Sequence, residues 1–158
     1  MAYIFEDQLQ VSAPADKVWA ILSDGDTWNT WNRHEVIDAG DFSPNAPKNQ
    51  RATVKLAWAG NGVWDETHPV RPDFVDAATR KVQISVRILA GLAFFNVHWY
   101  QVEVVNEHTC RIKQYERFEG LGPKLGVGFN YHLCHASMKA QNLALKEHVE
   151  ALQVPAKL

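Results

Sequence analysis

The stretch from Phe129 to Leu152 constrains the fold of this chain more than any other. Its apolar residues recur at the three- and four-residue spacing of a helix, and the stripe that they form also carries amide and imidazole side chains. A helix that packs flat on a sheet favours plain aliphatic residues, whereas a ligand cavity is largely apolar with a few placed polar groups. The pattern therefore predicts a long helix that covers a cavity. The stripe consists of Tyr131, Cys134, His135, Met138, Gln141, Asn142, Leu145 and Val149.

Strands are expected over most of the chain before this helix. Apolar and polar residues alternate over 52–58 and again over 81–88, which is the period of a strand with one buried face. Gly60-Asn61-Gly62 predicts a hairpin turn, and Pro69 and Pro72 are expected to end the returning strand. Further strands are expected over 3–11, 94–105 and 110–119.

Two short helices are expected after the first strand. Ser12-Ala-Pro14 marks the start of one helix, and Thr27–Asn32 predicts a second helical turn that carries Trp28 and Trp31. Residues 33–49 have the weakest pattern, with a short strand expected over 36–39 and a loop over 42–48. We interpret the run His34–Asp38 as a solvated strand edge. The order of elements predicts an α+β fold with an antiparallel sheet.

Length, charge and cysteine content narrow the range of functions. The 158 residues suffice for a single domain over 1–158 with a sizeable core. The net charge of −2 and the lack of a basic run argue against nucleic acid or a membrane as the main partner. No apolar run approaches the roughly 20 residues that span a bilayer, and Met1–Asp7 lacks the pattern of a signal peptide. Cys110 and Cys134 fit reduced thiols, so we expect a cytoplasmic protein. We expect it to be a monomer or a homodimer.

Four local patterns occur in order along nearly the whole chain. The first runs from Val11 to Trp19 and is followed by Leu22-Ser-Asp24. Two more are the segments 98–102 (HWYQV) and 116–120 (ERFEG), and the last is the helical segment 138–150. Together they resemble the START/Bet v 1-like superfamily, the group that includes the polyketide cyclases.

This resemblance implies a helix-grip fold, in which a curved antiparallel sheet of about six or seven strands wraps around the long C-terminal helix. The space between the sheet and the helix is the usual ligand site of that superfamily. Its members include carriers of hydrophobic ligands, cyclases and dehydratases, and hormone receptors. The resemblance therefore implies a hydrophobic small-molecule partner, while the fold alone does not decide between catalysis and carriage.

The candidate catalytic residues are Glu116, His98, Tyr100 and His135. Strand parity directs the first three into the expected cavity, on the same faces as the apolar residues of their strands. Burial should raise the pKa of Glu116, which suits a general acid or base, and His98 is its natural partner in proton transfer. Tyr100 or His135 would stabilise an oxyanion. Glutamate and histidine in such positions also fit a purely structural role, and that alternative stays open.

The candidate ligand contacts share an inward parity or a place near the expected opening. The strand after Gly62 has two possible parities, one with Trp64, Glu66 and His68 inward and the other with Asp65 and Thr67 inward. Tryptophans at the rim would suit a flat ligand. The candidates are Trp28, Trp31, Leu56, Trp58, Trp64, Ile84, Val86, Phe94, Asn96, Gln114, Phe118, Phe129, Tyr131, Met138 and Asn142.

Our leading hypothesis is a cofactor-independent cyclase or dehydratase that acts on a polyketide-like or aromatic intermediate. The alternatives are a non-catalytic carrier or sensor of a lipid, a quinone or another apolar ligand, and a protein-interaction module. His132 and His135 are three residues apart on the predicted helix, but no carboxylate lies beside them in the sequence. We therefore expect no metal and no cofactor.

Overall fold

The computed structural model describes residues 3–38, 52–127 and 129–153 of the chain. Seven strands occur in these ranges, namely β1 (Tyr3–Val11), β2 (Glu35–Asp38), β3 (Ala52–Leu56), β4 (Glu66–Asp76), β5 (Lys81–Ile88), β6 (Phe94–Asn106) and β7 (Thr109–Glu119). The helices are α1 (Ala15–Leu22), α2 (Trp28–Trp31), α3 (Leu121–Leu125) and α4 (Tyr131–Ala151), with short 3₁₀ turns η1 (Gly25–Thr27) and η2 (Leu89–Gly91). No helix in the described ranges is long and apolar enough to cross a membrane.

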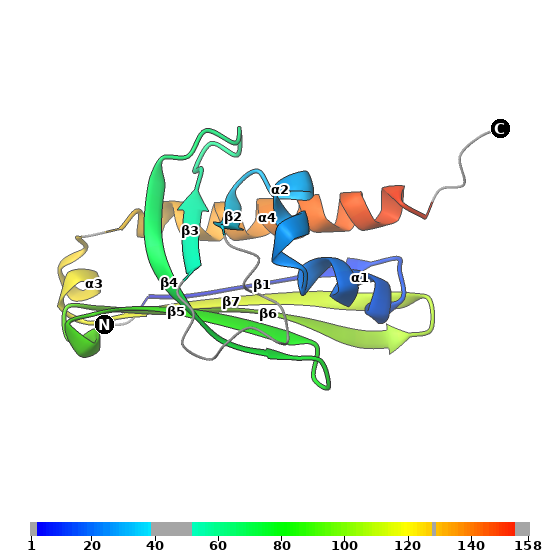
Figure 1. Ribbon diagram of the computed structural model, residues 1–158, viewed down its shortest axis with the longest axis horizontal. Helices are drawn as coiled ribbons and strands as arrows, with labels where there is room; N and C mark the ends of the chain where they lie inside the picture. Colours follow the sequence, from blue (N-terminus) through cyan, green and yellow to red (C-terminus); the bar gives the residue numbers. More distant parts are fainter. Residues whose placement is uncertain (1–2, 39–51, 128, 154–158) are drawn as a thin grey trace.

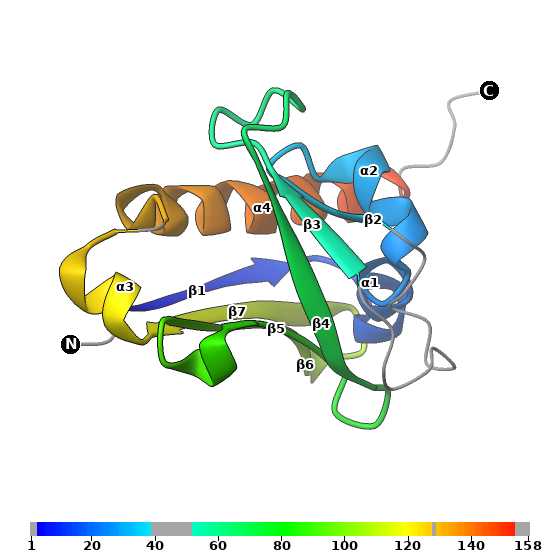
Figure 2. The ribbon, with the colours of Figure 1, turned by 60° about the vertical axis from the view of Figure 1, so that its left-hand side comes forward.

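All seven strands pair antiparallel in one sheet, in the order β1-β7-β6-β5-β4-β3-β2. The sheet is strongly curled. Figure 2 shows that β4 leaves the layer formed by β5, β6 and β7 and rises toward β3 and β2, while α4 runs along the concave side. The sheet and its terminal helix therefore form a helix grip, and the predicted α+β fold with two short helices after the first strand is confirmed.

Three of the eight buried residues of helix α4 are polar. Ser137, Gln141 and Asn142 are buried beside apolar side chains such as Met138 and Leu145. A helix that only packs on a sheet does not need buried amides, because each must find a hydrogen-bond partner. The mixed stripe predicted for this helix is therefore present, and its polar members lie between the helix and the sheet.

The two ends of the sheet are closed by different elements (Figure 1). At one end lie α1 and α2, where the fully buried Trp28 packs against Trp31 and its indole nitrogen donates to the Leu22 carbonyl at 2.9 Å. At the other end η2 and α3 lie side by side, since the Leu121 backbone nitrogen donates to the Leu92 carbonyl at 3.0 Å. The long axis of α4 spans the distance between these two ends.

The expectation that prolines end the strand after the hairpin is wrong. Strand β4 continues past Pro69 and Pro72 to Asp76. Proline has no backbone N–H, so it fits a strand only where the ladder leaves that position unused. Pro72 adjoins the register shift that interrupts the pairing of β4 with β5, between Pro72 and Phe74. The short strand predicted near residue 36 is confirmed as β2, and the loop predicted over 42–48 lies outside the described residues.

Candidate functional site

A small and mostly apolar cavity lies between the concave face of the sheet and the first half of α4. It consists of two neighbouring spaces, which admit the centres of water-sized molecules over about 40 Å³ and about 20 Å³. The larger space has room for about three waters, far less than a drug-sized ligand needs. Both spaces are lined by Glu35, Leu56, His98, Glu116 and Phe129.

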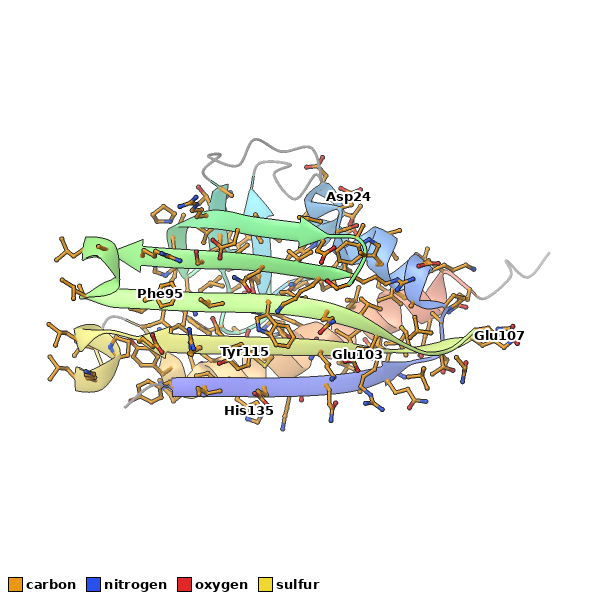
Figure 3. All side chains as sticks on the ribbon, turned by 90° about the horizontal axis from the view of Figure 1, so that it is seen from below. Asp24, Phe95, Glu103, Glu107, Tyr115 and His135 are labelled. Atoms are coloured by element: carbon orange, nitrogen blue, oxygen red, sulfur yellow. The ribbon has the colours of Figure 1, made fainter. Side chains whose placement is uncertain are left out.

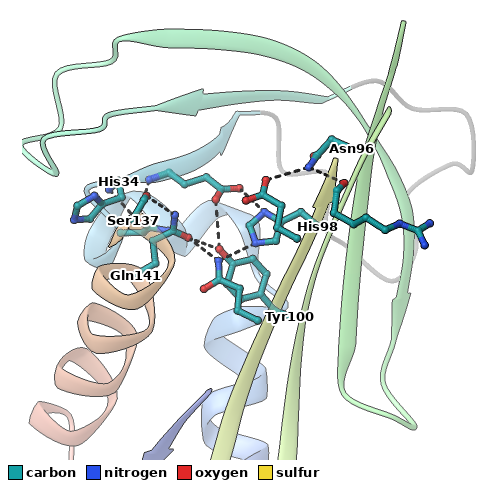
Figure 4. A network of polar contacts seen from close by, with 11 residues as sticks. His34, Asn96, His98, Tyr100, Ser137 and Gln141 are labelled. Carbon is teal, nitrogen blue, oxygen red and sulfur yellow. Dashed lines mark hydrogen bonds and ion pairs between the residues drawn. The ribbon is translucent and has the colours of Figure 1, made fainter. Parts of the chain in front are cut away.

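A network of polar side chains from β2, β6, β7 and α4 lies beside this cavity (Figure 4). The side-chain oxygen of Gln141 accepts hydrogen bonds from the Tyr100 hydroxyl and from Gln114 Nε2, the latter at 3.2 Å. Gln114 Nε2 also lies 2.8 Å from His98 Nε2, and His98 Nδ1 lies 3.7 Å from Glu35 Oε1. The network therefore ties the long helix to three strands of the sheet.

These contacts determine the tautomer of His98. An amide nitrogen only donates, so His98 Nε2 accepts from Gln114 and the ring proton lies on Nδ1, which faces Glu35. Burial lowers the pKa of His98 to about 3, so the ring is neutral at physiological pH. Because its one lone pair is already used by Gln114, His98 is poorly placed to accept a proton from a substrate.

Glu35 is only 2 % exposed and faces the same cavity. Burial raises the pKa of Glu35 to about 7, and hydrogen bonds from Gln141 and Tyr100 moderate this rise. The Tyr100 hydroxyl lies 3.4 Å from Glu35 Oε2, and Oε1 has no hydrogen-bond partner within the described part of the chain. Glu35 therefore changes its protonation near neutral pH, with one oxygen available to a ligand.

Glu116 lies on β7 opposite His98 of β6 and lines both spaces. Burial and, to a smaller extent, the nearby Glu35 carboxylate raise the pKa of Glu116 to about 8, and a hydrogen bond from Asn96 limits this rise. That bond joins Asn96 Nδ2 to Glu116 Oε1 over 3.1 Å. No lysine or arginine is among the described residues that line either space, so neither carboxyl group has a cationic partner there.

Phe129 closes the cavity between β4 and the start of α4. Its ring contacts the rings of Trp58 and Phe118, at centroid distances of 5.2 and 5.0 Å. The segment that carries it is fastened by Glu66, whose Oε1 accepts hydrogen bonds from Asn130 Nδ2 at 2.6 Å and from Trp58 Nε1 at 2.8 Å. Glu66 therefore holds the segment that borders the cavity on this side.

Comparison with known protein families identifies one family that the chain matches. Residues 4–150 match a family described as polyketide cyclase / dehydrase and lipid transport. The chain belongs to this family. None of the curated proteins compared with the chain matches it.

Several solved structures share the fold of this family member. The aromatase/cyclase Zhui from a Streptomyces species is 17 % identical, with a TM-score of 0.69 over 99 % of this chain and 98 % of that chain. A START superfamily protein from Mycobacterium smegmatis is 14 % identical, with a TM-score of 0.66 over 95 % and 99 % of the two chains. The di-domain aromatase/cyclase BexL is 18 % identical with a TM-score of 0.71, and the chain, 97 % of which is covered, spans about half (48 %) of its length.

Most of the predicted contact residues in this family member face the cavity. Glu116 and His98 line both spaces, as the strand parities predicted. On β4 the parity that turns Glu66 and His68 inward is the observed one. The other predicted residues that line the cavity are Leu56, Trp58, Ile84, Val86, Phe94, Asn96, Gln114, Phe118, Phe129 and Met138.

Two predicted placements are wrong. His135 is exposed and lies at the outer edge of the molecule beside β1 (Figure 3), because the inward face of α4 passes through Cys134 instead. Trp64 is 37 % exposed, since it precedes β4 and lies outside its alternation. In the segment between β7 and α4, Phe129 lines the cavity, whereas Leu121 and Leu125 are exposed.

Five further predicted residues are buried but do not line either space. Trp28 and Trp31 begin and end α2 and belong to the hydrophobic core. Tyr131 stacks on Tyr3 with ring centroids 4.5 Å apart. Asn142 donates to Asp7 of β1 at 2.8 Å, which anchors the helix. Tyr100 contacts the site through Gln141, Glu35 and the ring of His98, whose centroid lies 4.7 Å from its own. The full set is Trp28, Trp31, Tyr100, Tyr131 and Asn142.

Sequence reasoning missed Glu35 and Gln141. The interpretation of His34–Asp38 as a solvated strand edge is wrong, because Glu35 is turned under α4 and buried. No local pattern marks it, since β2 has only four residues. Gln141 was visible as a polar residue in the helix stripe. Cys134, which lines the smaller space, is no nucleophile at neutral pH because burial raises the pKa of its thiol far above the usual range.

Proposed function

We propose that this chain binds a hydrophobic small molecule and acts as a cofactor-independent cyclase or dehydratase on a polyketide-like or aromatic intermediate. One observation carries the proposal: Glu35, His98 and Glu116 converge from three strands on a single, largely apolar cavity. Titratable groups with perturbed pKa values that meet in a cavity favour a functional site. The family match and the likeness to aromatase/cyclases support the substrate class.

The two carboxyl groups divide the roles of base and acid. Burial raises the pKa of both carboxyl groups, and the ionised form of Glu35 raises that of Glu116, so near neutral pH the pair holds one proton. Glu35 takes a proton from the carbon next to a substrate carbonyl, and Glu116 gives its proton to a hydroxyl that leaves as water. One proton enters the pair and one leaves it, so a transfer from Glu35 to Glu116 restores the starting state. The Nδ1 proton of His98 faces Glu35 and orients it.

Substrate fit depends on Phe129, because the closed cavity holds only a few atoms. When the ring swings away, the substrate takes its place against Trp58 and Phe118, which are the side chains that Phe129 now contacts. An apolar wall of this kind restricts a flexible chain to folded conformers, which brings its reacting carbons together.

The test compares Glu35→Gln and Glu116→Gln with Glu6→Gln, an exposed glutamate on β1. The substrates are aromatic β-hydroxy ketones, and loss of water is followed by absorbance. Each cavity variant should lower kcat about 100-fold or more, since general acid–base catalysis contributes on that scale, and Glu6→Gln should not. Wild-type kcat should be bell-shaped in pH, with flanks near 7 and 8. Turnover that survives both cavity changes would reject the proton-transfer roles.

A carrier or sensor of an apolar ligand is the second candidate. It is favoured by the apolar lining and by the closure of the cavity by Phe129, which would shield a cargo from water. In this case native mass spectrometry of freshly purified protein would show a retained apolar compound. The glutamine variants would keep that compound, and no β-hydroxy ketone would be converted by the wild type.

A further inference from the structure

Apolar side chains are exposed together at the end of the molecule where β5 turns into β6 and β7 passes into α3. The exposed fractions of these side chains range from 53 % at Ile88 to 74 % at Leu89 and Leu92. Soluble proteins rarely expose large aliphatic residues in a contiguous group. We call this group the apolar tip, and it consists of Ile88, Leu89, Leu92, Leu121, Leu125 and Val127.

The two segments of the apolar tip are held side by side by the backbone. Leu121 N donates to the Leu92 carbonyl at 3.0 Å, and Gly122 N donates to the Ala93 carbonyl at 2.9 Å. Figures 1 and 2 both show η2 and α3 next to each other at this end of the sheet. The leucines of the two segments therefore form one surface.

The turn that presents these leucines is strained. Leu89 and Ala90 have positive φ angles of 50° and 55°, in the left-handed region that residues other than glycine rarely adopt. Such strain persists where the surrounding structure imposes it, and it is concentrated at functional sites. Here it holds Leu89 in solvent rather than against the sheet.

Within the two segments that form the apolar tip, the charged residues are all basic. The chain as a whole has a net charge of −2, but within segments 87–94 and 120–127 the charged residues are Arg87 and Lys124 alone. Both are exposed. The neighbouring Glu119 is neutralised by an ion pair with Arg117, at 3.4 Å between Oε1 and Nε. Exposed leucines flanked by basic residues complement a lipid surface that carries anionic headgroups.

The apolar tip is continuous with the mouth of the cavity. Phe94 follows the first segment directly, Phe129 follows the second, and the centroids of these two rings lie 6.3 Å apart. Both rings line the larger space of the cavity. A surface that receives the tip would therefore face the residue that closes the cavity.

We propose that the apolar tip docks this protein on an anionic lipid bilayer, with its leucines inserted among the acyl chains and Arg87 and Lys124 against the headgroups. In this orientation an apolar ligand passes between the bilayer and the cavity without crossing water. The docking does not depend on which ligand the cavity binds or on whether it is a substrate.

The experiment measures binding of the full chain to vesicles by co-sedimentation. Wild-type protein should bind vesicles of phosphatidylcholine mixed with phosphatidylglycerol, and bind more weakly to phosphatidylcholine alone, with the difference reduced by salt. The double variant Leu89→Ser with Leu125→Ser should lower the partition coefficient about tenfold or more, because each leucine inserts several methylene groups. Leu143→Ser, an exposed leucine on α4, serves as the matched control and should change nothing.

Charge and assembly are tested separately. Lys124→Glu should remove the preference for anionic vesicles while keeping the residual binding to neutral ones. All substituted side chains are exposed, so thermal unfolding should stay at the wild-type temperature and show that each variant folds. Equal binding by wild type and the double serine variant, or no binding by the wild type, would overturn the proposal. So would a wild-type dimer that the double variant converts to a monomer, since the tip would then contact a second copy.

Discussion

The polar network beside the cavity joins side chains from α4, β6, β7 and β2, so a single side chain can link elements that are far apart in the sequence. Gln141 is the clearest case. Its oxygen accepts from Tyr100 on β6 and Gln114 on β7, and its nitrogen donates to Ser137 Oγ at 3.1 Å within α4. A buried donor that loses its acceptor keeps the cost of leaving water without any compensation.

The substitution Gln141→Met keeps the side-chain volume and removes these hydrogen bonds. It should lower the free energy of unfolding by about 1–3 kcal/mol, because one N–H of Gln114 loses its acceptor and the Tyr100 hydroxyl keeps only the long contact with Glu35. Urea unfolding followed by tryptophan fluorescence measures the change. Gln8→Met, on the exposed face of β1, is the control. Equal effects of the two substitutions would show that the network adds no stability.

Phe129 limits the size of the cavity by its own bulk. Phe129→Ala should extend the larger space and lower the free energy of unfolding by roughly 1–3 kcal/mol, less than for a fully buried phenylalanine because the ring is only partly buried. Binding of 2-naphthol, measured by isothermal titration calorimetry, should become tighter than in the wild type.

The matched control is Phe95→Ala on the outer face of the sheet, where the Arg87 guanidinium lies 4.8 Å from the ring centroid (Figure 3). This variant should leave 2-naphthol binding unchanged. Weaker binding by Phe129→Ala would contradict its role as the closing residue and show that the ring is part of the binding surface instead.

At the scale of elements, α4 shows which features of a helix its sequence pattern predicts and which it does not. The stripe contains Cys134 and His135, adjacent residues about 100° apart on the helix. Periodicity alone does not decide which of the two faces inward. The contacts of Tyr131 and Met138 with the sheet set the rotation of the helix, and these depend on residues far away in the sequence. The pattern therefore predicted the element and its mixed face, while one of its expected site residues points outward.

In the strands, too, some site residues could be predicted from local alternation and others could not. Clear alternation on β6 and β7 correctly predicted that His98 and Glu116 face one cavity. The short strand β2 has no such alternation, and Glu35 reaches the cavity only because β2 pairs with β3, leaving Glu35 opposite Leu56. This second carboxyl group could not be predicted from local sequence, because its position depends on how the sheet curls. The end of β4 was wrongly predicted from its prolines for a similar reason. The register shift beside Pro72 depends on the pairing of β4 with β5, which local sequence does not show.

The contact between β7 and η2 depends on one glycine. Gly120 has a φ of 109°, and a Cβ built there would lie 2.8 Å from the Ala93 carbonyl oxygen. Gly120→Ala should therefore destabilise the protein by about 1–3 kcal/mol through backbone strain and this clash. Thermal unfolding compared with Gly62→Ala, where φ is 74° but no atom lies within 4 Å of the added Cβ, separates the clash from the strain. Equal effects of the two alanines would exclude the close approach as the cause.

For the whole molecule, the order of elements predicted an α+β fold with an antiparallel sheet, and the resemblance to the START/Bet v 1-like superfamily implied the helix grip. The interior that results is unusual in its protonation. In the folded protein the pKa values of Glu35 and Glu116 are higher than in the unfolded chain, and the pKa of His98 is lower. Stability is therefore linked to pH through three buried groups.

The pKa values determine the direction of this linkage. Between pH 4.5 and about 8 the folded protein holds protons on Glu35 and Glu116 that the unfolded chain has released, so stability falls as pH rises. His98 acts oppositely between pH 6.5 and about 3, since there the unfolded chain binds a proton that the folded protein does not. Above pH 4.5 the two carboxyl groups outweigh the one imidazole and below it the imidazole dominates, so stability should be highest near pH 4.5.

Urea unfolding at a series of pH values measures this dependence. Each carboxyl group contributes at most about 1.4 kcal/mol per pH unit, and Glu116→Gln should remove one such contribution and flatten the decline above pH 5. Glu6→Gln should leave the profile as it is in the wild type. A wild-type stability that rises between pH 5 and pH 8 would show that both carboxylates ionise without cost in the folded state.

The fastening of Phe129 by Glu66 also has a kinetic consequence. Arrival and departure of a guest both wait for the same hydrogen bonds to Asn130 and Trp58 to break. Association should then be far slower than diffusion allows, and largely independent of which guest is offered. Long residence times follow even for a weakly held compound, so dialysis would remove it slowly, and Asn130→Ala should hasten both uptake and loss while leaving the equilibrium constant nearly the same.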